Sequence, residues 1–178
     1  DFVASMTVGV YDLRHELEKL NPELSKNAES YLQYARQNDL CLSHGLHDPC
    51  MDKSLRPPED PDRCVRVVKE RDDGIIVRGA RFNTFGLFSN EIMICPTYGF
   101  KPEEKEYAMW FTVPCDAPGL SQIARESYGG RDPLDHPASA VYDEVDSLIV
   151  FDDVFIPWER VFLYREPVMA NQLFRSGV

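Results

Sequence analysis

Residues 142–167 read YDEVDSLIVFDDVFIPWERVFLYREP, and the middle of this stretch decides the fold. Residues 147–151, SLIVF, form a short run rich in β-branched and aromatic side chains, which is typical of a strand. The acidic residues at 143–146 and 152–153 flank this run and lack the spacing of an EF-hand. We therefore expect a strand here, with structural or solvated roles for its acidic neighbours.

Similar short runs occur on the N-terminal side, at residues 64–70, 75–78, 91–95 and 107–113. Asp72-Asp73-Gly74 lies between the first two runs and predicts a hairpin turn. In residues 107–113 the side chains at odd positions alternate with those at even positions, which predicts two differently packed faces. The pattern from about residue 40 onward therefore predicts a mainly antiparallel β domain.

The segment before residue 40 has the pattern of helices instead. In residues 21–38, Asn21 is a suitable cap, Pro22 fits the first helical position, and apolar residues recur every three or four positions. Residues 2–20 also read as helical, although Gly9 weakens that pattern. Because another helical pattern begins near the C-terminus, the order of elements predicts an α+β fold.

Composition excludes some classes of protein. The net charge of −11 argues against nucleic-acid binding, which needs clustered Lys and Arg. The 178 residues contain no apolar run long enough for a membrane span and begin without a signal-peptide pattern, so we expect a cytoplasmic location. The five cysteines form an odd set without a CxxC pair, which predicts reduced, mostly buried thiols.

The most conspicuous polar pattern is Cys41-x2-His44-x2-His47-x2-Cys50. Four such ligands suggest zinc, but the spacing differs from the usual zinc patterns. In an extended strand, residues three apart face opposite sides, so the four could not converge. We therefore predict no metal at this pattern.

His44 alone is a better candidate, because it lies where the helical part of the chain meets the β part. Such interfaces often hold ligand pockets, and a neutral imidazole there could accept the proton of a phenol. The alternative is a core histidine bonded to a backbone carbonyl. We expect surface or packing roles for His15 and His47, and a turn-fixing role for His136.

Two further groups of polar residues could bind a ligand. Asp52, Lys53 and Ser54 follow a proline and could hold a phosphate, or could be solvated loop residues. Asn83 and Thr84 precede Phe85-Gly86 and could hydrogen-bond a flat polar heterocycle, or could form an ordinary turn. The residues alone leave these alternatives open.

Several motifs resemble the 4-hydroxyphenylacetate 3-hydroxylase family. They are Asp73-Gly74-Ile75-Ile76-Val77-Arg78-Gly79-Ala80, Glu106-Tyr107-Ala108 leading to Val113-Pro114, Arg125-Glu126-Ser127-Tyr128, Asp135-His136-Pro137, the stretch 142–167 and the segment 38–44. Together they span nearly the whole chain. The resemblance implies an acyl-CoA-dehydrogenase-like fold, with N-terminal helices, a middle β-barrel and a C-terminal four-helix bundle. It places residues 1–40 at the end of the first domain, 41–165 in the barrel and 166–178 at the start of a bundle that is otherwise missing.

The resemblance also implies an activity. Members are oxygenase components of two-component monooxygenases, which take FADH2 from a separate NAD(P)H:flavin reductase and hydroxylate a phenol such as 4-hydroxyphenylacetate at the ortho carbon through a flavin C4a-hydroperoxide. His44 matches the family histidine that contacts the phenol oxygen and is the expected catalytic residue. Phe2 matches a second substrate-binding position, where many members have Tyr. Since the bundle supplies oligomer contacts and part of the flavin site, we expect a homotetramer at full length and an inactive segment alone.

The same resemblance assigns the cofactor residues. Cys50, Asp52, Lys53 and Ser54 match the flavin-binding loop, although Cys50 replaces a common glutamine and Lys53 a common arginine. Asn83 and Thr84 match a flavin-contacting turn, and residues 97–105 match a mobile loop over the substrate. Two alternatives remain, a 4-hydroxybutyryl-CoA dehydratase-like enzyme with FAD and an iron–sulfur cluster, and a non-catalytic binding module stabilised by zinc.

Overall fold

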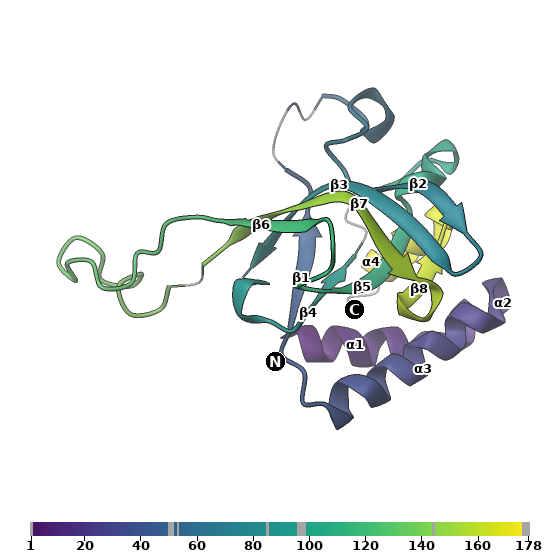
Figure 1. The fold of residues 1–178 in the computed structure, drawn as a ribbon, viewed down its shortest axis with the longest axis horizontal. Helices are drawn as coiled ribbons and strands as arrows, with labels where there is room; N and C mark the ends of the chain where they lie inside the picture. Colours follow the sequence, from purple (N-terminus) through teal and green to yellow (C-terminus); the bar gives the residue numbers. More distant parts are fainter. Residues whose placement is uncertain are drawn as a thin grey trace.

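The structure is a computed structural model that describes residues 2–49, 52, 54–84, 86–95, 99–143 and 145–175. Three helices precede the sheet and one follows it (Figure 1): α1 (Phe2–Asp12), α2 (Arg14–Leu20), α3 (Pro22–Gln37) and α4 (Pro167–Arg175). The strands are β1 (Leu42–His47), β2 (Arg66–Arg71), β3 (Gly74–Thr84), β4 (Glu91–Ile94), β5 (Met109–Pro114), β6 (Leu120–Ala124), β7 (Ser147–Pro157) and β8 (Val161–Tyr164). Short 3₁₀ turns include η1 (Pro57–Glu59) and η3 (Pro102–Tyr107).

The N-terminal helices follow the sequence signals closely. The Asn21 side chain accepts hydrogen bonds from the backbone N–H groups of Glu23 and Leu24, at 3.0 and 3.3 Å, and so caps α3. The predicted helix over residues 21–38 is therefore confirmed. The segment 2–20 is helical as well, but it divides at Leu13 between α1 and α2 and not at Gly9.

The eight strands form one sheet in the order β6-β7-β3-β1-β4-β5-β8, with β2 paired to β3. All neighbouring pairs are antiparallel except β1 and β4, which run parallel. The hairpin predicted at Asp72-Asp73-Gly74 joins β2 to β3, with Arg71 opposite Gly74. The prediction of a mainly antiparallel β domain is confirmed.

The predicted barrel is wrong. A barrel requires the first and last strands to pair, so that the sheet has no edge. Within the described residues, β6 pairs with β7 and β8 with β5, and the sheet path ends there. The chain between β6 and β7 extends away from the body of the molecule (Figure 1), and the sheet stays open.

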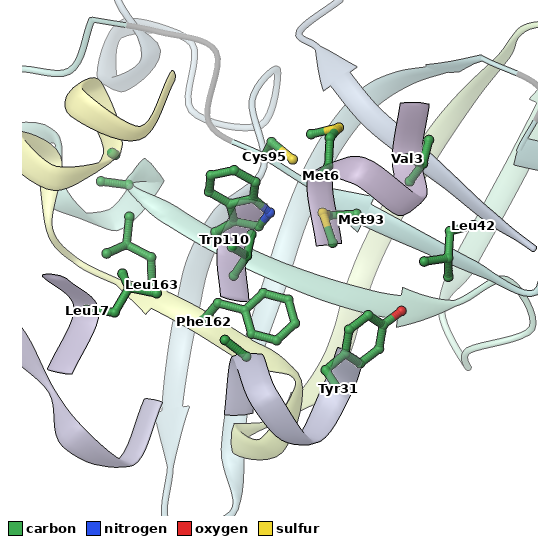
Figure 2. Packing of buried hydrophobic residues seen from close by; sticks show 14 of the residues in the cluster. Val3, Met6, Leu17, Tyr31, Leu42, Met93, Cys95, Trp110, Phe162 and Leu163 are labelled. Carbon is green, nitrogen blue, oxygen red and sulfur yellow. The ribbon is translucent and has the colours of Figure 1, made fainter. Parts of the chain in front are cut away.

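The two faces of β5 enter two different cores, as the alternation of residues 107–113 predicted. Met109, Phe111 and Val113 pack with apolar residues of β3, β4 and β7 inside the bent sheet. Trp110 lies on the opposite face, where α1, α2 and α3 cover β4, β5 and β8. Figure 2 shows Tyr31 of α3 next to Phe162 of β8, with their ring centroids 5.4 Å apart.

Gly79 of β3 is required by its backbone conformation and its surroundings. Its φ is +130°, which side chains rarely adopt, and an added Cβ would lie 2.2 Å from the Cys64 carbonyl oxygen. The register between β3 and β7 shifts at this residue. The regular pleat of β3 on either side of Gly79 is therefore interrupted by a close backbone approach that only glycine allows.

Among the described cysteines, Cys64 and Cys95 are buried, Cys115 is half-buried and Cys41 is exposed, and none of them forms a disulfide with another described cysteine. Burial raises the pKa of Cys64 to about 11 and also raises the pKa of Cys95. The prediction of buried, reduced thiols therefore holds for these two, whereas Cys41 is accessible. No helix in the described part of the chain is both long and apolar enough to cross a bilayer.

We predict that a thiol reagent at pH 8 labels Cys41 at least ~10-fold faster than Cys64, because the thiolate is the reactive form and the Cys64 thiol is both buried and neutral. Since the folded state raises this pKa, labelling of Cys64 should increase only as the pH rises toward about 11. Peptide mass mapping after timed labelling measures both rates. Equal labelling of the two residues in the folded protein would contradict the prediction.

Candidate active site

A cavity of about 630 Å³ is lined by residues on or next to β1, β3, β7 and β6. These four strands lie side by side in the sheet (Figure 1). Its volume is in the range of small-molecule and cofactor sites. Apolar and polar side chains both contribute to the lining, which consists of His44, Leu46, His47, Phe82, Asn83, Ile123, Ala124, Arg125, Asp146, Ser147 and Leu148.

The strand register explains which side chains face the cavity. Residues opposite each other on neighbouring strands point to the same face, and successive residues alternate. Phe82 lies opposite Leu148, which in turn lies opposite Ile123. These three residues line the cavity, and they form a continuous apolar row across β3, β7 and β6.

His44 stands at the end of this row nearest the helices. It pairs with Thr84 of β3. Two residues before it, Leu42 is part of the core that the helices cover, and two residues after it, Leu46 packs against that core. His44 itself is half-buried and lines the cavity. The imidazole therefore lies where the helical layer meets the sheet, between a sealed core and an open cavity.

The apolar row is more exposed than a core would be. Phe82 is 40% exposed although it lies on β3, inside the sheet, and Ile123 is 60% exposed on the edge strand β6. Large apolar side chains gathered in a concave surface with a polar rim are typical of a ligand site. This row provides a flat wall beside the His44 imidazole.

The polar rim of the cavity is organised around Arg125, which follows β6. Its guanidinium donates to Asp143 at 2.6 Å and to Asp146 at 3.3 Å. Hydrogen bonds from Arg125 and then from the Ser127 hydroxyl hold the pKa of Asp143 well below its usual range. Asp143 also accepts the backbone N–H of Tyr128 at 2.7 Å, so it fixes both ends of the segment that extends from the sheet.

Asn83 lines the cavity from the inner side of β3. It is 1% exposed, lies opposite Gly45 of β1, and donates from Nδ2 to the Ser43 hydroxyl at 3.3 Å. Ser43 in turn shares a hydrogen bond of 2.8 Å with Ser89. The Asn83 amide oxygen has no hydrogen-bond partner within the described residues, which is unusual for a buried acceptor.

A buried ion pair supports the end of β1 from behind the cavity. Arg81 Nη1 lies 2.8 Å from Asp48 Oδ1, and the two side chains are only 3% and 8% exposed. The same Arg81 nitrogen donates to the Leu46 carbonyl oxygen at 3.4 Å. Arg81 therefore fixes both the C-terminal end of β1, which lines the cavity, and Asp48, the first residue of the loop that follows it.

The loop after β1 is also held by a second buried arginine. Arg63 is 6% exposed and donates to the carbonyl oxygens of Asp52 and Leu55, the latter at 2.9 Å. Within the loop, Asp52 Oδ1 accepts the Ser54 backbone N–H at 2.9 Å and the Ser54 hydroxyl at 2.6 Å. These hydrogen bonds from the Ser54 hydroxyl and N–H lower the pKa of Asp52.

The structure brings some of the predicted site residues together and leaves others apart. His44 and Asn83 line the cavity, and the backbone of Thr84 pairs with that of His44. Asp52 and Ser54 lie in the following loop and are not among the lining residues. The side chain of Phe2, at the start of α1, and the residues Cys50 and Lys53 lie outside what the structure describes.

Several lining residues were not predicted. His47 was expected to have a surface or packing role and is exposed, but the register shift between Gly45 and His47 also places it opposite Phe82, where it lines the cavity. No sequence pattern links the other lining residues Phe82, Leu148, Arg125 and Asp146, because they lie on or next to three separate strands. Residues 147–151, SLIVF, are apolar at every position after Ser147, so the sequence does not show that Leu148 lies on the open face.

The spaced Cys41, His44 and His47 do not form a metal cluster. All three lie in or next to an extended strand, where successive positions alternate between faces. The described residues contain no group of three or more His, Cys, Asp or Glu side chains that could hold a metal ion. Cys50, the fourth member of the pattern, lies outside the described residues.

The fold defines a broad structural class to which the chain belongs. It is similar to glutaryl-coenzyme A dehydrogenase with a TM-score of 0.55 at 12% identity, which shows an acyl-CoA-dehydrogenase-like fold and no more. The family described as 4-hydroxyphenylacetate 3-hydroxylase N terminal matches residues 1–163. The chain therefore belongs to the 4-hydroxyphenylacetate 3-hydroxylase family.

Two curated relatives show how wide this family is. The chain is 38% identical over 157 residues to the 4-hydroxyphenylacetate 3-monooxygenase oxygenase component of Thermus thermophilus, which covers 86% of the chain and 33% of the relative. It is 36% identical over 174 residues to 4-hydroxybutyryl-CoA dehydratase/vinylacetyl-CoA-Delta-isomerase of Clostridium aminobutyricum, which covers 92% of the chain. The chain spans about a third of the length of the curated relatives that it matches.

A solved structure agrees with the sequence match. The oxygenase component of 4-hydroxyphenylacetate 3-monooxygenase, complexed with FAD, superimposes with a TM-score of 0.82 at 35% identity. The match covers 97% of this chain and 36% of that one. The path of this chain is thus similar to that of part of a structure complexed with FAD.

We predict that Arg81→Met lowers the free energy of unfolding by about 3–5 kcal/mol, because it leaves Asp48 as a buried charge without its ion-pair partner. Removing Asp48 as well, in Arg81→Met/Asp48→Leu, should recover part of this loss, since no uncompensated charge then remains. Urea unfolding of the wild type and the two variants measures both effects. A single-variant loss below about 1 kcal/mol would show that the ion pair does not matter for stability.

Proposed function

We propose that this chain is part of the oxygenase component of a two-component, FADH2-dependent monooxygenase that hydroxylates a phenol. The observation that carries the proposal is the placement of His44 at an apolar cavity, in a member of the 4-hydroxyphenylacetate 3-hydroxylase family. An imidazole beside a flat apolar wall suits a phenol ring with its oxygen directed at a proton acceptor. The substrate class includes 4-hydroxyphenylacetate and related phenols.

The cavity also fits a flat aromatic cofactor. Phe82, Ile123 and Leu148 form a continuous apolar wall, and the register sets Thr84 next to His44. Asn83, Thr84, Asp52 and Ser54, together with Cys50 and Lys53, are the residues that we propose to hold FAD. Reduced FAD, when bound, would supply two electrons to O2, so that one oxygen atom of O2 is transferred to the phenol and the other leaves as water.

In this proposal His44 acts on the substrate. Its imidazole accepts the phenol proton, or a hydrogen bond from it, and the resulting phenolate character makes the ortho carbon more nucleophilic. The neighbouring apolar side chains exclude water from the ring, so that oxygen is transferred to the phenol and not lost as hydrogen peroxide. Phe2, at the start of α1, is the proposed second contact to the substrate. The proposal also includes the route of oxygen transfer that the family implies, through a flavin C4a-hydroperoxide.

The proposal extends to the organisation of the whole protein. Residues 1–40 would end an N-terminal helical domain, 41–165 would form the middle β domain, and 166–178 would begin a C-terminal helical domain. The described elements support these bounds, because α3 ends at Gln37, all strands lie between Leu42 and Tyr164, and α4 begins at Pro167. An NAD(P)H:flavin reductase that supplies FADH2, a homotetrameric assembly and a cytoplasmic role in aromatic compound catabolism complete the proposal.

A second candidate is supported by the similarity to 4-hydroxybutyryl-CoA dehydratase. That activity requires an iron–sulfur cluster in addition to FAD, and hence clustered cysteine ligands. Here Cys41 is exposed, Cys64 and Cys95 are buried, and no ligand cluster occurs in the described residues. Iron and sulfide analysis of the complete protein, with its visible absorption spectrum, separates the two candidates, because stoichiometric iron and sulfide would favour the dehydratase.

We predict that His44→Ala lowers the rate of phenol hydroxylation by about 100-fold or more, since a positioned base contributes 10²–10⁴-fold. The oxidation of reduced flavin should continue and yield hydrogen peroxide, because His44 acts on the phenol and not on the flavin. The assay uses the complete oxygenase with a flavin reductase and a panel of phenols, and follows oxygen uptake, hydroxylated product and peroxide.

His15→Ala serves as the control, because the His15 side chain is exposed on the surface of α2 and contacts Glu18 at 3.7 Å. It should leave the ratio of product to peroxide unchanged. His47→Ala tests whether position in the cavity alone is sufficient, and we expect a smaller effect than for His44→Ala. Unchanged coupling of flavin oxidation to hydroxylation in His44→Ala would overturn the proposed role of His44.

A further inference from the structure

Two buried polar side chains lie next to each other where β3 and β7 border the cavity. Asn83 and Ser147 are partners in the register of these strands, both line the cavity, and they are 1% and 2% exposed. The Asn83 amide oxygen has no hydrogen-bond partner within the described residues. Because buried acceptors are nearly always satisfied, this oxygen indicates a ligand that brings a hydrogen-bond donor to the cavity.

A chain of hydrogen bonds runs from Asn83 into the protein. Asn83 Nδ2 donates to the Ser43 hydroxyl at 3.3 Å, and Ser43 Oγ lies 2.8 Å from Ser89 Oγ. Ser43 has no other side-chain partner among the described residues, so its own proton is available for Ser89. Ser89 Oγ in turn lies 3.2 Å from the Cys115 sulfur, just after β5. The chain therefore connects the cavity to a thiol that does not line it.

A second chain ends at the same sulfur. The Ser147 hydroxyl donates to Gln122 Oε1 at 3.3 Å, and the Gln122 side chain also hydrogen-bonds Cys115. Burial raises the pKa of Cys115, although the hydrogen bonds from Ser89 and Gln122 lower it. Both cavity-lining polar groups are thus connected through β6 or β1 to one neutral thiol.

The chemistry of the thiol sets the direction of both chains. An S–H group is a weak donor, so the arrangement in which Ser89 and Gln122 donate to the sulfur is favoured over the reverse. In this arrangement Ser43 donates to Ser89, and an Asn83 N–H and the Ser147 proton are both used inside the protein. The Asn83 oxygen and the lone pairs of the Ser147 hydroxyl are left as acceptors for a ligand.

We infer that Cys115 is a positioning residue that orients Asn83 as an acceptor, and that Asn83 thereby selects reduced over oxidised flavin. This inference rests on the proposed function, which supplies FAD as the ligand of the cavity. The central ring nitrogen N5 is a bare acceptor in oxidised FAD and carries an N–H in reduced FAD. An acceptor at the cavity stabilises the N–H of the reduced ring, whereas it places two lone pairs against each other when the ring is oxidised.

The test measures this selectivity on the complete oxygenase. Reduced FAD is titrated anaerobically and oxidised FAD in air, and the ratio of the two dissociation constants gives the selectivity for the reduced form. We expect the wild type to bind reduced FAD more tightly. Cys115→Ala removes the sulfur, so the Asn83 amide can turn over and present its NH2 group. The selectivity should then fall by about 3- to 10-fold, the value of one neutral hydrogen bond.

The ratio distinguishes a positioning role from a merely structural one, because a loosened fold would weaken the binding of both forms equally. Ser43→Ala interrupts the first chain and should lower the selectivity as Cys115→Ala does. Cys115→Ser keeps an acceptor for Ser89 and Gln122 and should restore the wild-type ratio. Cys41→Ala is the matched control, because Cys41 is an exposed cysteine that does not line the cavity, and it should leave the ratio unchanged.

The outcomes separate this inference from the proposed function. A wild-type oxygenase that hydroxylates a phenol but binds both forms of FAD equally overturns the inference and leaves the proposed function intact. An unchanged ratio in Cys115→Ala, or an equal loss in Cys115→Ser, does the same. Failure of the wild type to bind either form of FAD and to hydroxylate any phenol overturns both.

Discussion

The register between β1 and β3 is the constraint on which the site depends. Gly45 lies opposite Asn83, and an added Cβ at Gly45 would lie 2.6 Å from the end of the Ile94 side chain, so a larger residue there would require Ile94 to move. This close approach fixes which residues of β1 face inward. Because side chains alternate along a strand, a slip by one residue would turn His44 into the core and Gly45 toward the cavity. Backbone packing therefore sets the face of the sheet on which the imidazole lies.

The segments next to the cavity are held mainly by arginine side chains. Arg81 holds the start of the loop after β1, Arg63 holds its middle through two carbonyl oxygens, and Arg56 holds its end against Glu104. A guanidinium suits this task, because its planar fork makes several directed hydrogen bonds and stays charged when it is partly buried. Irregular backbone near a site cannot be fixed by strand pairing, so each loop residue needs an anchor in the rigid scaffold. A lysine at any of these positions would keep the charge but lose at least one of the directed contacts.

Much of the fold was predictable from the sequence, and the failures have physical causes. Residues 21–38 carry a cap, a proline and an apolar period that all agree, so the helix was predicted almost to the residue. The strands β2, β3, β4, β5 and β7 were predicted because they are rich in β-branched and aromatic side chains, although β3 and β7 extend further than those runs. β1 and β6, with the sequences LSHGLH and LSQIA, contain too few such residues to be recognised, and both border the cavity. His44 was identified as a candidate, but the apolar wall opposite it depends on pairing between distant strands, which local sequence does not specify.

The similarity to two enzymes of different chemistry does not decide between them, because the chain resembles both relatives to nearly the same degree. A shared fold positions a cofactor, while the reaction depends on the groups placed around it. In the described residues the group at the cavity is a half-buried imidazole between Leu42 and Leu46, facing an apolar row. None of the described cysteines lines this cavity, with Cys64 and Cys95 buried, Cys115 half-buried and Cys41 exposed. An imidazole in that position suits proton transfer with a phenol, whereas a dehydration that depends on an iron–sulfur cluster requires thiols to converge, and the described residues contain no such group of ligands.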